Sequence, residues 1–174
     1  MNKYESQKFK YISDNTSKLV NEMLTNQNLA KYIYYLDNEK HPLDPSNPSI
    51  SPIRVRDKNF KFVLFDDNIV TDTQILVFVN PAMNNYRGTT LSIDTFVMDV
   101  AIPNKYWIIH NGGDIQLRAY EIAYETAKAI DGKSITGIGD VEIVSAQTGR
   151  IGSKGISVIS INIEVKNSSV KTVV

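Results

Sequence analysis

Cysteine is absent from this sequence of 174 residues. Its absence excludes disulfide bonds and thiolate metal sites, so the fold does not depend on the redox compartment. No apolar run approaches the ~20 residues that span a bilayer, and the first residues form no apolar stretch. We therefore expect neither a membrane span nor a signal peptide, and a soluble protein made in a cytoplasm.

The chain also has no formal net charge, because 19 Lys and Arg residues balance 19 Asp and Glu residues. A neutral chain has no general field that attracts nucleic acid, and it has little electrostatic defence against self-association. The densest basic cluster is interrupted by Asp57, which favours a mixed solvated face over a nucleic-acid footprint. Its members are Arg54, Arg56, Lys58 and Lys61.

Residues that could carry catalysis are scarce. The two histidines, His41 and His110, stand in a predicted loop and turn without a carboxylate or second histidine at ligand spacing. The adjacent Asp66 and Asp67 suit a turn better than an acid and base pair. Glycines between 149 and 155 lack both the spacing and the following helix of a phosphate-binding loop. We expect no catalytic residue, metal site or cofactor, and a protein that is not an enzyme.

The length fits a single α+β domain over residues 1–174, with its helical part in residues 1–40. Apolar spacing predicts a helix from about Ser13, capped by Ser13 or Asp14, then a break at residues 26–28 and a second short helix to Leu36. The tyrosines of this part fit either packing at the solvent boundary or a subunit interface. Residues 41–52 hold four of the six prolines and predict a loop.

Residues 60–165 predict a mostly antiparallel, twisted β-sheet with one amphipathic helix packed on it. The helix is expected to begin near Asp114 and to end at Gly132. Apolar parity changes along residues 91–102, which indicates either a bulge near Asp94 and Thr95 or a strand covered on both faces. Strands are predicted at residues 60–64, 73–79, 91–102, 106–109, 141–143 and 159–165.

Three other segments are expected outside regular structure. Residues 81–89 read as a protruding polar loop, residues 146–155 as a flexible basic connection, and residues 166–174 as a loose tail. Trp107 is expected either to anchor the core beneath the helix or to mark a contact surface.

Two sequence stretches carry a family resemblance. The segments TNQNLAKYIYYLDNEKHPL and MDVAIPNKYWIIHNGGDIQLRAYEIAYETAKAIDGKSITGIGDVEIVS, with the strands between them, resemble the tail-terminator and neck proteins of tailed bacteriophages. The similarity covers most of the chain in outline. It lies in the order of elements: a leading helix, a Pro-Leu loop, strands, an aromatic strand end before a Gly-Gly turn, an Arg-bearing helix and a final β-pair.

The resemblance implies a virion subunit that forms a ring, usually a hexamer, at the head-proximal end of the tail. Its partners would be copies of itself, the tail tube protein and the neck or connector proteins, with genomic DNA passing through the lumen without sequence readout. Assembly would take place in the host cytoplasm. On this resemblance, interface or channel positions are expected at Arg87, Arg118, Arg150 and Lys154.

Two alternatives remain open at this stage. One is another ring of the same particle, such as a head-closure or connector-adaptor protein. The other is a small enzyme or nucleic-acid-binding module whose site has no recognisable motif.

Overall fold

The computed structural model describes residues 3–37, 40–66, 68–87, 91–151 and 155–167. Its helices are α1 (Lys3–Met23), α2 (Gln27–Tyr34), α3 (Pro52–Asn59) and α4 (Arg118–Ile130), with the 3₁₀ turn η1 (Asn104–Tyr106). Its strands are β1 (Phe60–Lys61), β2 (Leu76–Arg87), β3 (Leu91–Pro103), β4 (Ile108–Asn111), β5 (Asp114–Leu117), β6 (Ser134–Ile135), β7 (Gly139–Ile151) and β8 (Ile156–Asn167). The predicted α+β class is confirmed.

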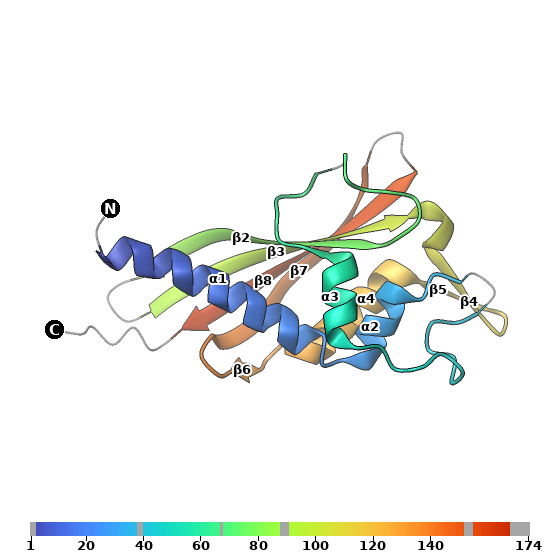
Figure 1. Ribbon diagram of the computed structural model, residues 1–174, viewed down its shortest axis with the longest axis horizontal. Coiled ribbons are helices and arrows are strands. Elements are labelled where there is room, and N and C mark those ends of the chain that lie inside the picture. Colours follow the sequence, from blue (N-terminus) through green and yellow to red (C-terminus); the bar gives the residue numbers. More distant parts are fainter. Residues whose placement is uncertain (1–2, 38–39, 67, 88–90, 152–154, 168–174) are drawn as a thin grey trace.

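Six strands form the main sheet in the order β1-β2-β3-β8-β7-β6. Every neighbouring pair is antiparallel except β1 and β2, which run parallel over two residues each. Figure 1 shows β2, β3, β8 and β7 side by side along the long axis, with the helices gathered on one side of them. The β4–β5 hairpin forms a separate two-stranded sheet.

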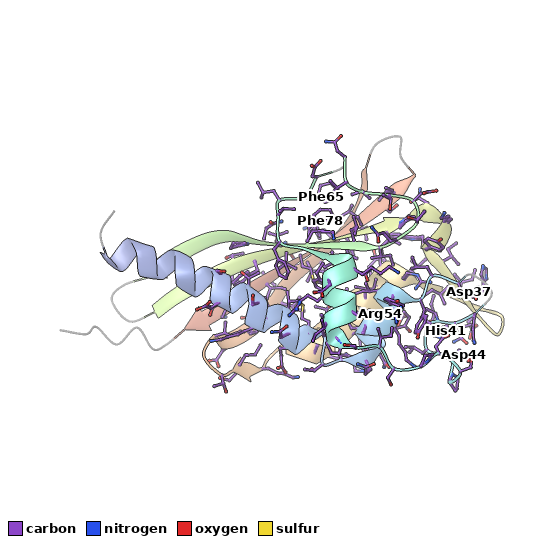
Figure 2. The ribbon with its side chains drawn as sticks, viewed as in Figure 1. Asp37, His41, Asp44, Arg54, Phe65 and Phe78 are labelled. Carbon is purple, nitrogen blue, oxygen red and sulfur yellow. The ribbon has the colours of Figure 1, made fainter. Side chains whose placement is uncertain are left out.

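The main core lies between the sheet and the helices. Along β3, Phe96, Met98 and Val100 alternate toward this core, where they join Ala119 and Ile122 of α4. The opposite face of the sheet has a smaller core of its own, because the connection 62–75 between β1 and β2 covers it there. Figure 2 shows Phe65 of this connection against Phe78 of β2, with ring centroids 4.9 Å apart.

The bulge expected in β3 near Asp94 and Thr95 lies instead in the partner strand. The register of β2 shifts between Pro81 and Met83, opposite Phe96 and Thr95 of β3. Alternation therefore continues through β3, and Asp94 faces the helices as a buried carboxyl. The open alternative, that both faces are covered, holds for the part of the sheet beneath the connection 62–75.

The predicted break between the first two helices is confirmed. Asn26 caps α2, since its side-chain oxygen accepts hydrogen bonds from the backbone amides of Asn28 and Leu29. The expected start at Ser13 or Asp14 is wrong, because α1 already begins at Lys3 and both residues lie within it. Residues 3–12 contain neither glycine nor proline, so nothing in that stretch stops the helix from extending.

Two segments expected to be loops are strands. Strand β2 runs through Pro81 to Arg87, and β7 runs to Ile151, each pairing its backbone with β3 or β8. Pairing with a neighbouring strand satisfies the backbone groups of both segments, and this pairing does not require apolar side chains. The expected strand at residues 60–64 is reduced to Phe60 and Lys61, the only residues there that pair with β2.

The helix expected from Asp114 begins four residues later. Asp114–Leu117 pairs with Ile108–Asn111 as a hairpin around the predicted Gly112–Gly113 turn, and α4 then begins at Arg118. Gly132, with φ +68°, follows the end of α4 as expected.

The helix α3, with Pro52 in its first turn, was not predicted. Of the expected loose tail, Lys166 and Asn167 belong to β8, and the rest lies outside the described residues.

Candidate assembly surfaces

Arg118 fixes the position of α4 against α2. Its guanidinium donates to three backbone carbonyls: Nε to Tyr106 at 2.7 Å, and Nη1 to Tyr32 and Tyr35 at 2.9 and 3.0 Å. The Tyr32 and Tyr35 carbonyls lie at the C-terminal end of α2, where helix carbonyls lack partners within the helix. Burial lowers the pKa of the Arg118 guanidinium to about 10, so it remains charged near neutral pH.

The expectation that Arg118 lies at a ring or channel surface is wrong for this side chain. It is 1 % exposed, and the whole guanidinium faces the interior of the chain. Its place at the first residue of α4 points it at the end of α2, which explains why it is buried. Arg118 thus positions α4 and leaves the opposite face of that helix to solvent.

Glu125 makes a second connection between α4 and α2. Its carboxylate accepts from the side-chain amides of Asn26, at 2.8 Å, and Asn28, at 3.4 Å, and pairs with Lys128 at 3.1 Å. Burial would raise the pKa of Glu125, but these hydrogen bonds outweigh it and leave that pKa below its usual value. Asn26 therefore caps α2 and ties it to α4 at once.

The solvent face of α4 and the β4–β5 hairpin form an apolar surface, here called the hairpin–helix surface. Ile108 pairs with Leu117 and His110 with Ile115, so these side chains share one face of the hairpin. Leu117, Tyr120 and Tyr124 then follow at the helical spacing of three and four residues. Its large apolar residues are Ile108, Ile115, Leu117, Tyr120 and Tyr124, all exposed, with Ile115 at 64 % and Tyr124 at 60 %.

A second apolar surface, here called the covering-segment surface, lies on the connection 62–75. Its exposed residues are Phe62, Val63, Leu64 and Ile69, and Leu64 is 78 % exposed. Phe65 and Val70 of the same segment turn inward onto the smaller core. The segment is therefore anchored from below while it presents apolar side chains outward.

The two surfaces lie on opposite sides of the sheet. The helix α4 packs on the face that carries the main core, and the segment 62–75 packs on the face that carries Phe78 and Ala101. Singly exposed apolar residues are ordinary, whereas grouped ones mark contact sites. Two different surfaces on opposite sides suit head-to-tail association between copies of one chain.

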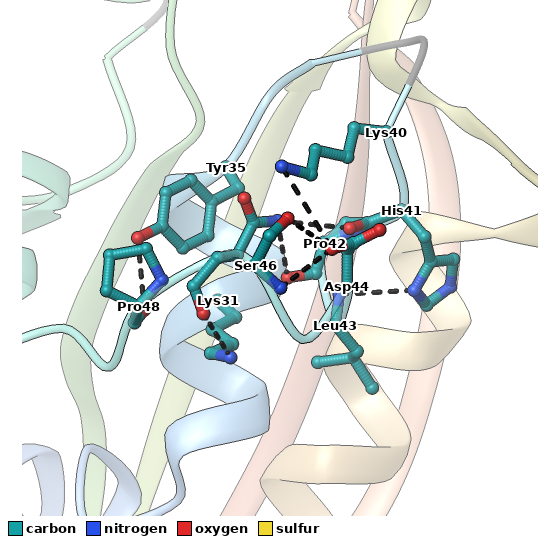
Figure 3. A network of polar contacts seen from close by, with 10 residues as sticks. Lys31, Tyr35, Lys40, His41, Pro42, Leu43, Asp44, Ser46 and Pro48 are labelled. Carbon is teal, nitrogen blue, oxygen red and sulfur yellow. Dashed lines mark hydrogen bonds and ion pairs between the residues drawn. The ribbon is translucent and has the colours of Figure 1, made fainter.

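The Pro-rich loop at residues 41–52 is held by an extensive polar network (Figure 3). Asp44 accepts from Ser46 and pairs with Lys40, and Tyr35 donates to the Pro48 carbonyl at 3.0 Å. His41 accepts from the Leu43 amide through Nδ1, which leaves Nε2 to donate to the Gln116 side chain at 2.9 Å. His41 thus joins this loop to β5, while His110 is exposed on the hairpin.

Trp107 packs on the core, as one of the two expectations from the sequence held, and its role in a contact surface stays a prediction. It packs partly buried against the main core, and it lines an open cleft of about 490 Å³ with Ile108, Thr148 and Ser157.

Within the described ranges no three of His, Asp and Glu come together as a metal site. No helix in the described part of the chain is both long and apolar enough to cross a membrane.

The remaining interface candidates are placed only in part. Arg87 ends β2 and Arg150 lies near the end of β7, so each stands at the far end of a long strand. Lys154 lies outside the described residues. Sequence reasoning missed both apolar surfaces, although the spacing of Leu117, Tyr120 and Tyr124 was a readable signal.

Fold and surfaces together define an α+β protein with two exposed apolar surfaces. The YomW family model matches residues 26–165, most of the chain, and the chain belongs to the YomW family. A comparison with curated proteins gave no match.

Among solved structures, the chain is similar to one chain of the virion of a native gene transfer agent (GTA) particle. That chain is 11 % identical, the match covers 52 % of this chain and 68 % of the other, and the TM-score is 0.37. A TM-score of this size does not establish a shared fold.

Proposed function

We propose that this protein is a structural subunit of a tailed-bacteriophage virion that assembles head-to-tail with copies of itself. The finer role that we assign is the tail terminator, a ring at the head-proximal end of the tail that joins the tail tube to the neck. The protein acts through contact and not through catalysis. The sequence resemblance to tail-terminator and neck proteins supports the choice of particle and position.

The single observation that carries the proposal is the pair of exposed apolar surfaces on opposite sides of the sheet. Tyr124 and Leu64, at 60 % and 78 % exposure, are the most exposed aromatic and aliphatic members of the two surfaces. Association that joins unlike surfaces leaves each free for a further copy, and it closes into a ring when the rotation between copies allows. Burial of such residues is the main driving force of protein association.

Mass measurement by light scattering across a concentration series tests the assembly. The wild-type protein should exceed the monomer mass, and Tyr124→Glu and Leu64→Glu should each lower it by placing a charge in an apolar contact. Ser49→Glu, an exposed change on the Pro-rich loop outside both surfaces, is the matched control. A wild-type protein that stays monomeric both alone and with isolated tails would contradict the proposal.

Labelled antibody in negative-stain images tests the finer role. Label at the head-proximal end of isolated tails supports the tail terminator. Label on filled heads but not on tails would instead assign a head-closure or connector-adaptor ring, the alternative within the same particle. Virions that carry no label at all would contradict a virion role altogether.

A further inference from the structure

The helix α3 carries an unusual pair of positive charges. Arg54 and Lys58 stand four residues apart, and both lie against the ring of Tyr34, at 5.2 and 4.3 Å from its centroid (Figure 2 labels Arg54). Both side chains are exposed, and neither forms an ion pair with a carboxylate in the described part of the chain. Like charges at this spacing repel each other, and the contacts of both cations with the Tyr34 ring offset that repulsion.

Two further cations lie in the same segment, but Arg56, two residues from both Arg54 and Lys58, does not share their side of the helix. Arg56 pairs with Asp57 at 3.3 Å, and Lys61, just beyond the helix, donates to the Lys58 carbonyl. Asp57 is therefore the single carboxylate among four basic side chains between residues 54 and 61. The helix runs directly into β1, so the basic face lies at the β1 end of the sheet.

Toward the other end of the sheet, β7 and β8 carry an acidic face. Glu142 and Glu164 are directly opposite each other in the antiparallel register, and Asp140 is opposite Lys166. These residues alternate with Val141, Val165 and other core residues, so they share the face of the sheet that points away from the helices. Like charges directly opposite each other destabilise a strand pair.

Only one of the three carboxylates has an ion pair in the described part of the chain. Lys166 forms an ion pair with Glu142, and its hydrogen bond to that carboxylate, with the further charges of Glu142, Glu164 and Asp140, raises the Lys166 pKa. The acidic face thus keeps an excess of negative charge, as the basic face keeps an excess of positive charge. The two faces therefore carry excess charges of opposite sign within one molecule.

We infer that the basic face of α3 in one copy docks against the acidic β7–β8 face of the next copy. The inference rests on the proposed self-assembly and names charge complementarity as what sets the orientation of neighbouring subunits. The faces lie toward opposite ends of the strand order, so each copy can use both at once, as head-to-tail association requires.

Charge exchange tests the inference. Arg54→Glu with Lys58→Glu, and separately Glu142→Lys with Glu164→Lys, should each raise the concentration needed for assembly by about tenfold or more, because like charges then face each other. An equimolar mixture of the two double variants should restore assembly, since each variant face then meets an opposite charge on the other variant. Lys105→Glu with Lys133→Glu, a double reversal at two other half-exposed sites, should leave assembly unchanged.

Failure of rescue in the mixture would overturn the inference, provided that both variants keep the wild-type unfolding midpoint. So would unchanged assembly of both double variants while Tyr124→Glu and Leu64→Glu still dissociate the protein, an outcome that leaves the proposed function standing. A third overturning result is that Arg54→Glu with Lys58→Glu assembles normally but loses salt-dependent binding to a single-stranded oligonucleotide. That result would assign the basic face to nucleic acid.

Discussion

Arg118 shows how much of this fold depends on one side chain. A buried arginine is ordinarily matched by a carboxylate, yet this one is satisfied by backbone carbonyls of η1 and of the end of α2. Its planar fork reaches all three at once, which a lysine ammonium at the same place could not do with the same geometry.

Replacement of Arg118 should therefore be severe. Arg118→Ala leaves three carbonyls without their donor and is expected to lower the free energy of unfolding by about 3 kcal/mol. Arg118→Lys should lower the free energy of unfolding by roughly half as much, because lysine keeps the charge but not the planar guanidinium. Urea unfolding measures both, with the exposed Lys105→Ala as a control expected to stay within about 0.5 kcal/mol. An Arg118→Ala protein as stable as the control would contradict this structural role of Arg118.

Asp94 introduces a pH dependence at the residue scale. It is buried beneath α1, where Asn15 donates to one carboxylate oxygen at 3.5 Å and the other oxygen has no partner. Burial raises its pKa above the ordinary value of 3.8, against the smaller opposing effect of Asn15. The folded protein therefore keeps this proton at pH values where the unfolded chain has lost it, and stability falls as the pH rises through that window.

Asp94→Asn should remove this contribution. The variant is expected to be more stable than the wild type near neutral pH, with the difference shrinking as the pH falls toward 3.8. The new amide could also donate to the Asn15 side-chain oxygen, which has no partner now. Unfolding midpoints at a series of pH values check the sign. If the stability of Asp94→Asn relative to the wild type instead increased as the pH fell, Asp94 would be stabilised as the carboxylate in the folded protein.

At the scale of elements, the connection between α2 and α4 rests on Asn26. Asn26→Ala removes the cap of α2 and the hydrogen bonds to the carboxylate and the carbonyl of Glu125. We expect a loss of about 2 kcal/mol, at the upper end for a helix cap, because both roles disappear together. Asn28→Ala, which removes only one long contact to Glu125, should lose clearly less. Equal losses in urea unfolding would contradict the double role.

Elements with strong local signals were predictable. The break before α2 and the Gly112–Gly113 turn have residue types that specify a conformation by themselves. The extensions of β2 and β7 were not predictable, because residues such as Asn84 and Gln147 become strand only through pairing with residues far along the chain. Similarly, β5 was read as a helix start because its pairing with β4 is invisible to a helical pattern.

The same distinction applies to the surfaces: some of their features could be predicted from the sequence and others could not. Tyr120 and Tyr124 could be assigned to one helix face from their spacing, but their exposure depends on which face Arg118 holds inward. The opposing basic and acidic faces depend on sheet order, which brings Glu142 beside Glu164 and places α3 at the other end. Local sequence patterns carry no information on that order.

For the whole molecule, the two kinds of contact predict opposite responses to salt. Sodium chloride screens exposed charges, with a Debye length that falls from about 10 Å at 0.1 M to about 3 Å at 1 M. Ammonium sulfate strengthens apolar burial at equal ionic strength. We therefore expect assembly mass to fall as sodium chloride rises and to recover in ammonium sulfate. Light scattering measures both, and a mass that is indifferent to sodium chloride would leave the apolar surfaces as the sole contact.

The three hydrogen bonds of Arg118 have a further consequence for local opening of the folded protein. Because one guanidinium at the start of α4 hydrogen-bonds both η1 and the end of α2, opening of any of these pieces breaks a bond that holds it to another. Their amide protons should exchange with solvent deuterium as one cooperative unit with a shared opening free energy. The outward aromatic face of α4 is thus presented by a body that stays rigid until that entire unit unfolds.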